Sequence, residues 1–175
     1  MSEKVSIMIS EEEVNRRIAE LGKQISEDYA GKSLHIVTVL KGGVFFSCEL
    51  AKRITLPVSL DFMSVSSYGD ETKSSGVVKI VKDLDEPIKG KNVLVVEDIV
   101  DSGRTLSYLL EYLNARKPES LKLCTMLDKP SRRVKPVEVH YTGFEIEDKF
   151  VVGYGLDYAQ KYRNLPYIGC VELDV

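Results

Sequence analysis

Short apolar runs alternate along the chain with segments in which apolar residues recur at helical spacing. The helical sets are Val14, Ile18, Leu21 and Ile25, and then Leu106, Leu109, Leu110 and Leu113. The apolar runs have the length of strands and comprise His35–Leu40, Val58–Val65, Val93–Val96 and Leu121–Leu127. Strands that alternate with helices favour parallel pairing through right-handed crossovers. We therefore predict an α/β fold, a mostly parallel twisted sheet flanked by helices.

Weaker signals complete the predicted order of elements. The run Val77–Val81 predicts a strand that returns beside Val58–Val65, so the polar segment Asp70–Gly76 becomes the tip of a hairpin. Such a tip is most often an ordinary surface loop, and the alternative is a flap that closes over a site. Two further short strands are predicted at Val137–Tyr141 and Phe150–Gly153. Because the chain has no internal repeat or linker, residues 1–175 are interpreted as one domain.

Composition narrows the class of protein. With 43% hydrophobic and 29% charged residues, the chain resembles an ordinary soluble protein, and its net charge of −3 argues against broad binding to nucleic acid. The three cysteines are odd in number and lie among apolar residues, so Cys48, Cys124 and Cys170 are interpreted as buried thiols in a reducing compartment. No apolar run has membrane-spanning length, and residues 1–10 lack a signal-peptide pattern. We expect a cytoplasmic protein without membrane contact.

The most informative stretch is Val93–Leu113, which predicts a strand, a short loop and a helix. Unpaired N–H groups and the positive end of the helix dipole meet at the start of such a helix, which makes it a ready anion site. Glu97 and Asp98 end the strand and would repel a phosphate, so they are interpreted as holding hydroxyl groups or a metal ion beside it. The alternative is a capped helix after a strand whose acids merely face solvent.

Candidate polar residues follow several predicted strands, and ligands bind beyond the carboxyl ends of parallel strands. These residues are Lys41 and Gly42, the segment 97–105, Lys129 and Asp157. Ser102, Gly103 and Thr105 suit a phosphate, with Lys41, Arg104 and Arg163 as possible cations. Mg²⁺ usually takes one or two carboxylates together with substrate oxygens. No P-loop or dinucleotide fingerprint is present. The residues alone therefore indicate a phosphorylated ribose ligand with Mg²⁺, but no particular reaction.

The segment Val93–Thr105 (VLVVEDIVDSGRT) resembles the phosphoribosyl-diphosphate (PRPP) motif of the type I phosphoribosyltransferases. The wider pattern resembles their purine salvage branch, the hypoxanthine-guanine phosphoribosyltransferases. Matching pieces run from about residue 35 to the C-terminus in the order Leu40–Gly43, Ser67–Tyr68, Val93–Thr105, Leu127–Lys129, Phe150–Tyr158 and Arg163. Ser102 and Arg104 stand where many relatives have Thr and Lys, and both keep a hydroxyl group and a cation.

The resemblance implies a fold and an activity. The fold is that of the type I phosphoribosyltransferases, with a core at about residues 32–140 and a small hood built from the N-terminal segment and residues 141–175. The activity is transfer of the 5-phosphoribosyl group from PRPP to N9 of a 6-oxopurine, hypoxanthine or guanine, which yields IMP or GMP and diphosphate. Mg²⁺ is the implied cofactor, and a homodimer or homotetramer is the implied assembly.

The resemblance also implies roles for residues around the PRPP. The 5′-phosphate is bound by the loop of Asp101, Ser102, Gly103, Arg104 and Thr105. Glu97 and Asp98 hold the ribose hydroxyls or their Mg²⁺. Lys41 and Gly42 belong to a diphosphate loop, in which the family often has a cis peptide bond, and Arg163 meets the diphosphate.

On the purine side, the resemblance implies that Lys129 donates to the 6-oxo group and that Phe150 stacks on the base. Backbone groups of Val151 read the edge of the base, and Asp157 lies at the purine pocket and ligates Mg²⁺. Asp101 is the candidate general base at purine N7. Ser67 and Tyr68 begin a flexible loop that closes during turnover.

A second class of function uses the same scaffold, because fold alone does not settle function. It is a regulator that senses PRPP or a nucleotide and binds RNA or DNA. Such a protein is expected to carry a basic face or an added nucleic-acid-binding domain. The chain is acidic and retains Lys129 and Asp101, so the enzyme is favoured.

Overall fold

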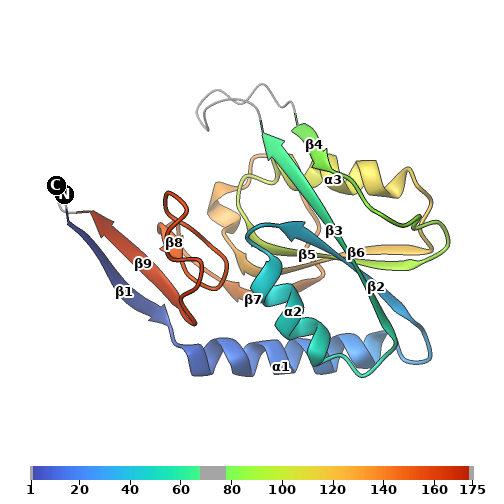
Figure 1. The fold of residues 1–175 in the computed structure, drawn as a ribbon, viewed down its shortest axis with the longest axis horizontal. Helices are drawn as coiled ribbons and strands as arrows, with labels where there is room; N and C mark the ends of the chain where they lie inside the picture. Colours follow the sequence, from blue (N-terminus) through green and yellow to red (C-terminus); the bar gives the residue numbers. More distant parts are fainter. Residues whose placement is uncertain (1, 68–77, 174–175) are drawn as a thin grey trace.

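A six-stranded sheet in the order β4-β3-β2-β5-β6-β7 forms the centre of the molecule (Figure 1). The computed structural model describes residues 2–67 and 78–173. The strands of this sheet are β2 (Leu34–Leu40), β3 (Val58–Ser67), β4 (Val78–Lys82), β5 (Asn92–Val100), β6 (Ser120–Asp128) and β7 (Tyr141–Glu145). All neighbours pair in parallel except β3 and β4. The predicted mostly parallel α/β sheet is confirmed.

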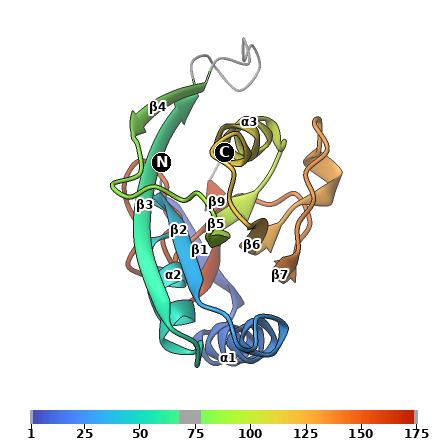
Figure 2. The same ribbon diagram turned by 90° about the vertical axis from the view of Figure 1, so that its right-hand side faces the viewer.

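Helices cover both faces of this sheet, and each face has its own apolar core. The helices α1 (Glu11–Asp28) and α2 (Val44–Lys52) pack on one face, and α3 (Arg104–Asn114) packs on the other (Figure 2). The strands between them are apolar on both sides, as parallel strands buried on two faces must be. In β5, Leu94 and Val96 belong to the first core, and Val93 and Val95 belong to the second.

A second, three-stranded antiparallel sheet lies beside the large one, at the left in Figure 1, in the order β1-β9-β8. It joins β1 (Glu3–Ile9) near the N-terminus to β8 (Val151–Val152) and β9 (Ile168–Leu173) from the far end of the chain. These terminal segments form the small hood of the fold. The predicted division of the chain into a core at about residues 32–140 and a hood stays a prediction. Within the range 141–175 that was predicted for the hood, β7 lies in the large sheet.

The strand predicted at Val137–Tyr141 is wrong, because the strand begins only at Tyr141. The side chain of His140 accepts a hydrogen bond from the backbone N–H of Leu123 (3.1 Å), so an imidazole replaces the carbonyl that a strand would offer β6 there. Val137 and Val139 instead pack their side chains against the core beneath α3. Their apolar pattern therefore marks burial and not strand pairing.

Candidate active site

The loop for which phosphate binding was predicted connects β5 to α3. Gly103, with φ of +83°, turns the chain into α3, and the N–H of Arg104 donates a hydrogen bond to the hydroxyl of Ser102 (3.4 Å). The carbonyl oxygen of Ser102 accepts hydrogen bonds from the N–H groups of Val134 (2.9 Å) and Lys135 (3.0 Å). Arg104 and Thr105 occupy the first two positions of the helix. Residues 134 and 135 thus fix the position of the loop. The start of the helix can present backbone donors to an anion.

Glu97 and Asp98 lie near the carboxyl end of β5 and form an acidic pair. Glu97 is buried, and burial together with the adjacent Asp98 carboxylate raises the pKa of Glu97 well above its usual range. Asp98 accepts a hydrogen bond from the N–H of Ile99 at Oδ1 (2.8 Å). Two carboxylates forced together in this way can be stabilised by a cation or by hydroxyl donors. That is the chemistry predicted for them.

The loop after β2 packs directly on this acidic pair. The Leu40–Lys41 peptide bond is cis, as the resemblance implied. A Cβ added to Gly42 would overlap the carboxylate of Asp98, and a Cβ added to Gly155 would overlap the carbonyl oxygen of Gly42. Gly42 therefore lies between β5 and the chain that follows β8. Only a glycine fits at position 42 beside Asp98, and the role of Lys41 and Gly42 in binding diphosphate stays a prediction.

Asp157 and Arg163 lie in the segment between β8 and β9 and interact with each other. Their side chains form an ion pair of 3.4 Å, and the guanidinium of Arg163 also donates to the carbonyl oxygen of Gly155 (2.7 Å). Asp157 accepts a further hydrogen bond from the N–H of Gln160 (2.8 Å). We expected Asp157 to follow a strand of the parallel sheet, but it follows β8 in the small sheet. The contact between Gly155 and Gly42 brings this segment to the large sheet's rim.

The predicted base-binding residues come from two elements, the end of β6 and the start of β8. Lys129 directly follows β6 and is only 7% exposed, whereas Phe150 is 53% exposed. The ring of Tyr158 packs edge-on against that of Phe150, with centroids 5.4 Å apart, so a face of Phe150 can receive a planar ligand. Val151 is buried in β8, where it pairs with Cys170.

Two charged residues that the sequence-based predictions missed connect these groups. Arg132 donates from Nε to Asp101 (3.0 Å) and from a terminal nitrogen to Asp148 (3.4 Å). Asp148 also lies 3.6 Å from the ammonium of Lys129. A signal was present, since Arg132 lies three residues after Lys129 and Asp148 two residues before Phe150. Residues so close to candidate ligands in the sequence are candidates themselves.

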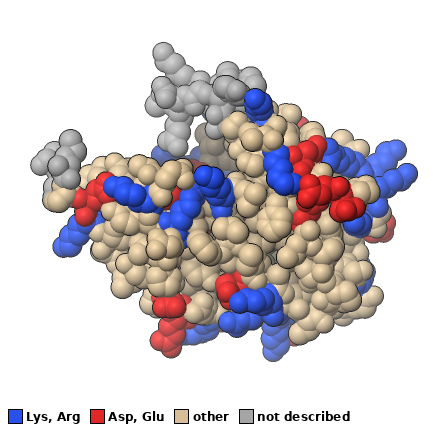
Figure 3. Space-filling view, in the orientation of Figure 1, with Lys and Arg blue, Asp and Glu red and all other residues tan. Residues whose placement is uncertain are grey.

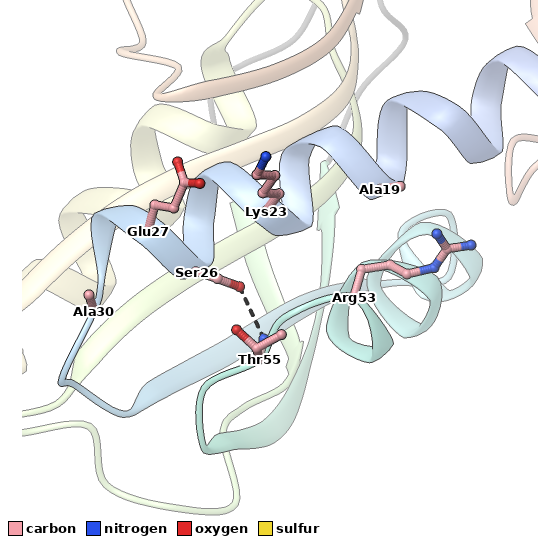
Figure 4. A pocket seen from close by; sticks show the side chains of 7 residues that line it. All are labelled: Ala19, Lys23, Ser26, Glu27, Ala30, Arg53 and Thr55. Atoms are coloured by element: carbon pink, nitrogen blue, oxygen red, sulfur yellow. Dashed lines mark hydrogen bonds between the residues drawn. The ribbon is translucent and has the colours of Figure 1, made fainter.

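Some predicted features lie outside the described residues or are only partly described. Tyr68 and the Asp70–Gly76 segment lie outside them, and Ser67 is described only as the end of β3. A groove of about 430 Å³ opens elsewhere, between the second half of α1 and the segment that follows α2 (Figure 4), and none of the predicted site residues lines it. Two of the residues that line this groove are joined by a hydrogen bond from the N–H of Thr55 to the hydroxyl of Ser26 (3.0 Å). The predicted residues lie instead at the carboxyl ends of β2, β5 and β6 and in the segment around β8.

The carboxylates of this rim fit a magnesium ion that is shared with a substrate. Within residues 2–67 and 78–173, no three His, Cys, Asp or Glu side chains converge into a complete protein cage. Mg²⁺ needs no such cage, since one or two carboxylates with substrate oxygens and waters suffice. Glu97, Asp98 and Asp157 offer hard oxygen donors, and the raised pKa of Glu97 indicates a place where added positive charge is favourable.

Comparison with known proteins identifies the family. The family model described as "Phosphoribosyl transferase domain" matches residues 9–159. The chain belongs to the phosphoribosyltransferase family. It is 53% identical to the hypoxanthine phosphoribosyltransferase of Salmonella typhimurium, over 99% of this chain and 98% of that protein. It is 51% identical to the hypoxanthine-guanine phosphoribosyltransferase of Mycobacterium avium, over 95% of this chain and 85% of that protein.

A solved structure supports the same assignment. The hypoxanthine-guanine phosphoribosyltransferase of Bacillus anthracis superposes with a TM-score of 0.93 at 45% identity, over 98% of this chain and all of that one. The predicted phosphoribosyltransferase fold and the assignment to the purine salvage branch are confirmed, and the relatives give no support to the regulator. Among the described residues, no helix is long and apolar enough to cross a membrane.

Proposed function

We propose that the chain transfers the 5-phosphoribosyl group of PRPP to N9 of a 6-oxopurine, hypoxanthine or guanine, and releases diphosphate. One observation carries the proposal. Ion pairs through Asp148 and Arg132 link a buried ammonium, Lys129, to Asp101 in the loop whose helix start suits a phosphate. An exposed ring, Phe150, lies two residues after Asp148. A site with a base-reading cation and an anion loop fits a nucleotide product. The family membership and the names of the relatives support the same activity.

The PRPP side of the site divides among three segments. The 5′-phosphate binds the N–H groups and hydroxyls of Asp101–Thr105 at the start of α3. Glu97 and Asp98 accept hydrogen bonds from the ribose hydroxyls. Lys41 and Gly42 offer backbone groups to the diphosphate, and Arg163 offers it a cation. The close contacts of Gly42 with Asp98 and Gly155 support this division, because they place the three segments together.

The base is bound between Phe150 and the end of β6. Phe150 stacks on the purine, Lys129 donates a hydrogen bond to the 6-oxo oxygen, and Val151 offers backbone groups to the edge of the ring. In the reaction, N9 forms a bond to C1′ while the bond from C1′ to the diphosphate oxygen breaks. Asp101 accepts the proton from N7, and Lys129 stabilises charge that grows on the 6-oxo oxygen.

Mg²⁺ is the proposed cofactor, and Glu97, Asp98 and Asp157 would hold it. When bound, the ion supplies positive charge beside the leaving diphosphate. The oxygen donors of this set and the close pair of Glu97 and Asp98 support the choice of a hard divalent cation.

The setting of the enzyme is also part of the proposal. Cys48, Cys124 and Cys170 are all free thiols, which supports a reducing compartment and hence the cytoplasm. Acidic and basic side chains are interspersed on the face seen in Figure 3, so this face is not a basic surface for nucleic acid. A homodimer or homotetramer is proposed by resemblance to the family.

The test is an assay of diphosphate release from PRPP and Mg²⁺ with five bases in parallel: hypoxanthine, guanine, xanthine, adenine and orotate. We expect release with hypoxanthine and guanine. Adenine should be a poor substrate, because the Lys129 ammonium and the exocyclic amine of adenine are both donors. Lack of release with all five bases would overturn the proposal and favour the regulator.

A further inference from the structure

Four side chains of alternating charge form a continuous row at the base site. Asp101 pairs with Arg132 (3.0 Å), Arg132 with Asp148 (3.4 Å), and Asp148 with Lys129 (3.6 Å). The two ends of the row are the proposed proton acceptor and the proposed ligand of the 6-oxo group. The two members between them, Arg132 and Asp148, have no part in the mechanism described above.

The backbone at both ends of the row is already fixed. The N–H of Lys129 donates to the carbonyl oxygen of Val100 (3.0 Å), and Arg133 donates to the carbonyl oxygen of Asp101 (2.9 Å). The short 3₁₀ turn Pro130–Arg132 closes with a bond from the N–H of Arg132 to the carbonyl oxygen of Lys129 (3.1 Å). Only the side chains of Lys129 and Asp101 remain to be oriented, and Arg132 and Asp148 contact those.

We propose that Asp148 and Arg132 are positioning residues, Asp148 for the ammonium of Lys129 and Arg132 for the carboxylate of Asp101. The inference rests on the proposed function, since it concerns how the base site is aligned. Asp148 and Arg132 together fix the distance between the Lys129 ammonium and the Asp101 carboxylate before the purine binds. Such alignment lowers the cost of ordering the site during the reaction.

The pair of Asp148 and Lys129 suits this role because it attracts the ammonium without saturating it. A buried ammonium needs a counter-charge, and Asp148 is the acid that pairs with Lys129 among the described residues. A separation of 3.6 Å is too long for a hydrogen bond, so the protons of the ammonium remain available to a carbonyl oxygen. Asp148 thus holds the cation in place and leaves its donors for the base.

Arg132 suits its role because a guanidinium is planar and can donate to two carboxylates at once. It uses Nε for Oδ1 of Asp101 and a terminal nitrogen for Asp148. Oδ2 of Asp101 has no hydrogen-bond partner among the described residues and so remains open for a proton from the purine. A lysine at position 132 would keep the charge but lose this two-way geometry.

The first experiment measures the KM for hypoxanthine and the KM for PRPP separately in the Asp148→Asn variant. We expect the KM for hypoxanthine to rise about three- to tenfold while the KM for PRPP stays unchanged. Asp148→Glu, which keeps the charge, should restore part of the loss. In a Lys129→Ala background, Asp148→Asn should have no further effect, because Asp148 acts through Lys129.

The second experiment tests Arg132 in the same way. Arg132→Ala should lower kcat about three- to tenfold, and Arg132→Lys should be intermediate. In an Asp101→Asn background the Arg132→Ala change should have little further effect on kcat. Arg16→Ala is the matched control, because Arg16 forms an exposed pair with Glu12 on α1, and both kinetic constants should stay at the wild-type values.

The outcomes separate the two proposals. If the wild-type protein does not release diphosphate with hypoxanthine, the proposed function fails. If it does, and Asp148→Asn leaves the KM for hypoxanthine unchanged or adds its full effect to Lys129→Ala, the positioning role is overturned. A fall in melting temperature with both KM values unchanged would assign Asp148 a structural role only, and this too would overturn it.

Discussion

Gly42 packs against Asp98 so closely that no side chain fits between them. A Cβ at position 42 would overlap Oδ2 of Asp98 and would also lie near its other carboxylate oxygen (3.3 Å). On its other side, the carbonyl oxygen of Gly42 occupies the place that a Cβ of Gly155 would take. The loop after β2 is therefore in contact with the acid of β5 and with the segment that leads to Asp157. One glycine joins three parts of the proposed PRPP site.

Gly42→Ala should therefore impair PRPP binding. The added methyl group must displace the carboxylate of Asp98 or the loop itself, and a misplacement of about 1 Å can lower kcat/KM on the order of a hundredfold. We therefore expect kcat/KM for PRPP to fall by about tenfold or more. Gly31→Ala is the control: its φ of +79° makes an alanine less stable there, but a Cβ meets nothing within 4 Å, so the KM for PRPP should stay unchanged. Wild-type kinetics in Gly42→Ala would show that this contact is not needed.

Asp101→Asn should lower kcat strongly and change the KM for PRPP little. Asparagine keeps the shape of the side chain and still accepts a hydrogen bond from Arg132, but it cannot take a proton from purine N7. Loss of a general base costs roughly a hundredfold to ten-thousandfold in rate. Steady-state kinetics with hypoxanthine and PRPP would measure this. Glu12→Gln, a change of an exposed acid on α1, is the control, and equal kcat values in the two variants would contradict the role of Asp101.

Much of the fold could be predicted because its signals are local in the sequence. The strand, loop and helix of Val93–Leu113 appear as β5, the 101–103 loop and α3, with Leu106, Leu109 and Leu113 buried. The gathering of Lys41, Asp98 and Lys129 at one rim followed from parallel pairing, since β2, β5 and β6 are neighbours. Periodicity and topology together are sufficient for these statements.

Other features depend on contacts between distant residues and leave no local signal. The strand β1 was not predicted, because its partner β9 lies more than 150 residues away, with Glu3 opposite Leu173. Cys48 was predicted to be buried, which is wrong: α2 turns Phe46 and Leu50 inward and leaves Cys48 exposed. Cys170 is partly exposed, and only Cys124 is fully buried.

The site shows the same division between local and distant information. The motif residues could be assigned because they are consecutive, and their roles remain predictions for the variants above to test. The pairing of Arg132 with both Asp101 and Asp148 spans 31 and 16 residues and depends on how the 3₁₀ turn folds back. Composition and spacing cannot specify such a row of charges.

Gly103→Ala should destabilise the protein and disturb the phosphate loop. The residue has φ of +83°, and a Cβ there would overlap the carbonyl oxygen of Lys135. A left-handed conformation alone costs an alanine about 1–2 kcal/mol, and the overlap adds to that cost. Gly90→Ala is a matched control, because φ is +73° but no atom lies within 4 Å of its Cβ. Denaturant unfolding should show a larger loss for Gly103→Ala, and equal losses would show that packing on Lys135 does not matter.

Asp83 should make the melting temperature depend on pH in the acid range. Burial raises the pKa of its carboxyl, but hydrogen bonds from Arg116 and Tyr112 outweigh this effect and bring the pKa to about 2, from an ordinary value of 3.8. Because the folded-state pKa is the lower one, the stabilisation is fully present above pH 4 and is lost as the pH falls from about 4 to about 2. These contacts tie the chain after β4 to the last turn of α3 and to the segment just after it.

Asp83→Asn tests this, because it removes the titrating group and keeps the shape. At pH 7 we expect the variant to melt about 2–4 °C below the wild type, a modest gap since the pair is partly exposed. The gap should close as the pH falls from 4 to 2, because the wild-type carboxylate becomes protonated and loses its charge-assisted bonds. Asp85→Asn, which affects an exposed pair with Lys82, should show little gap at any pH. A gap for Asp83→Asn that stays constant between pH 7 and 2 would mean that its effect is steric and not electrostatic.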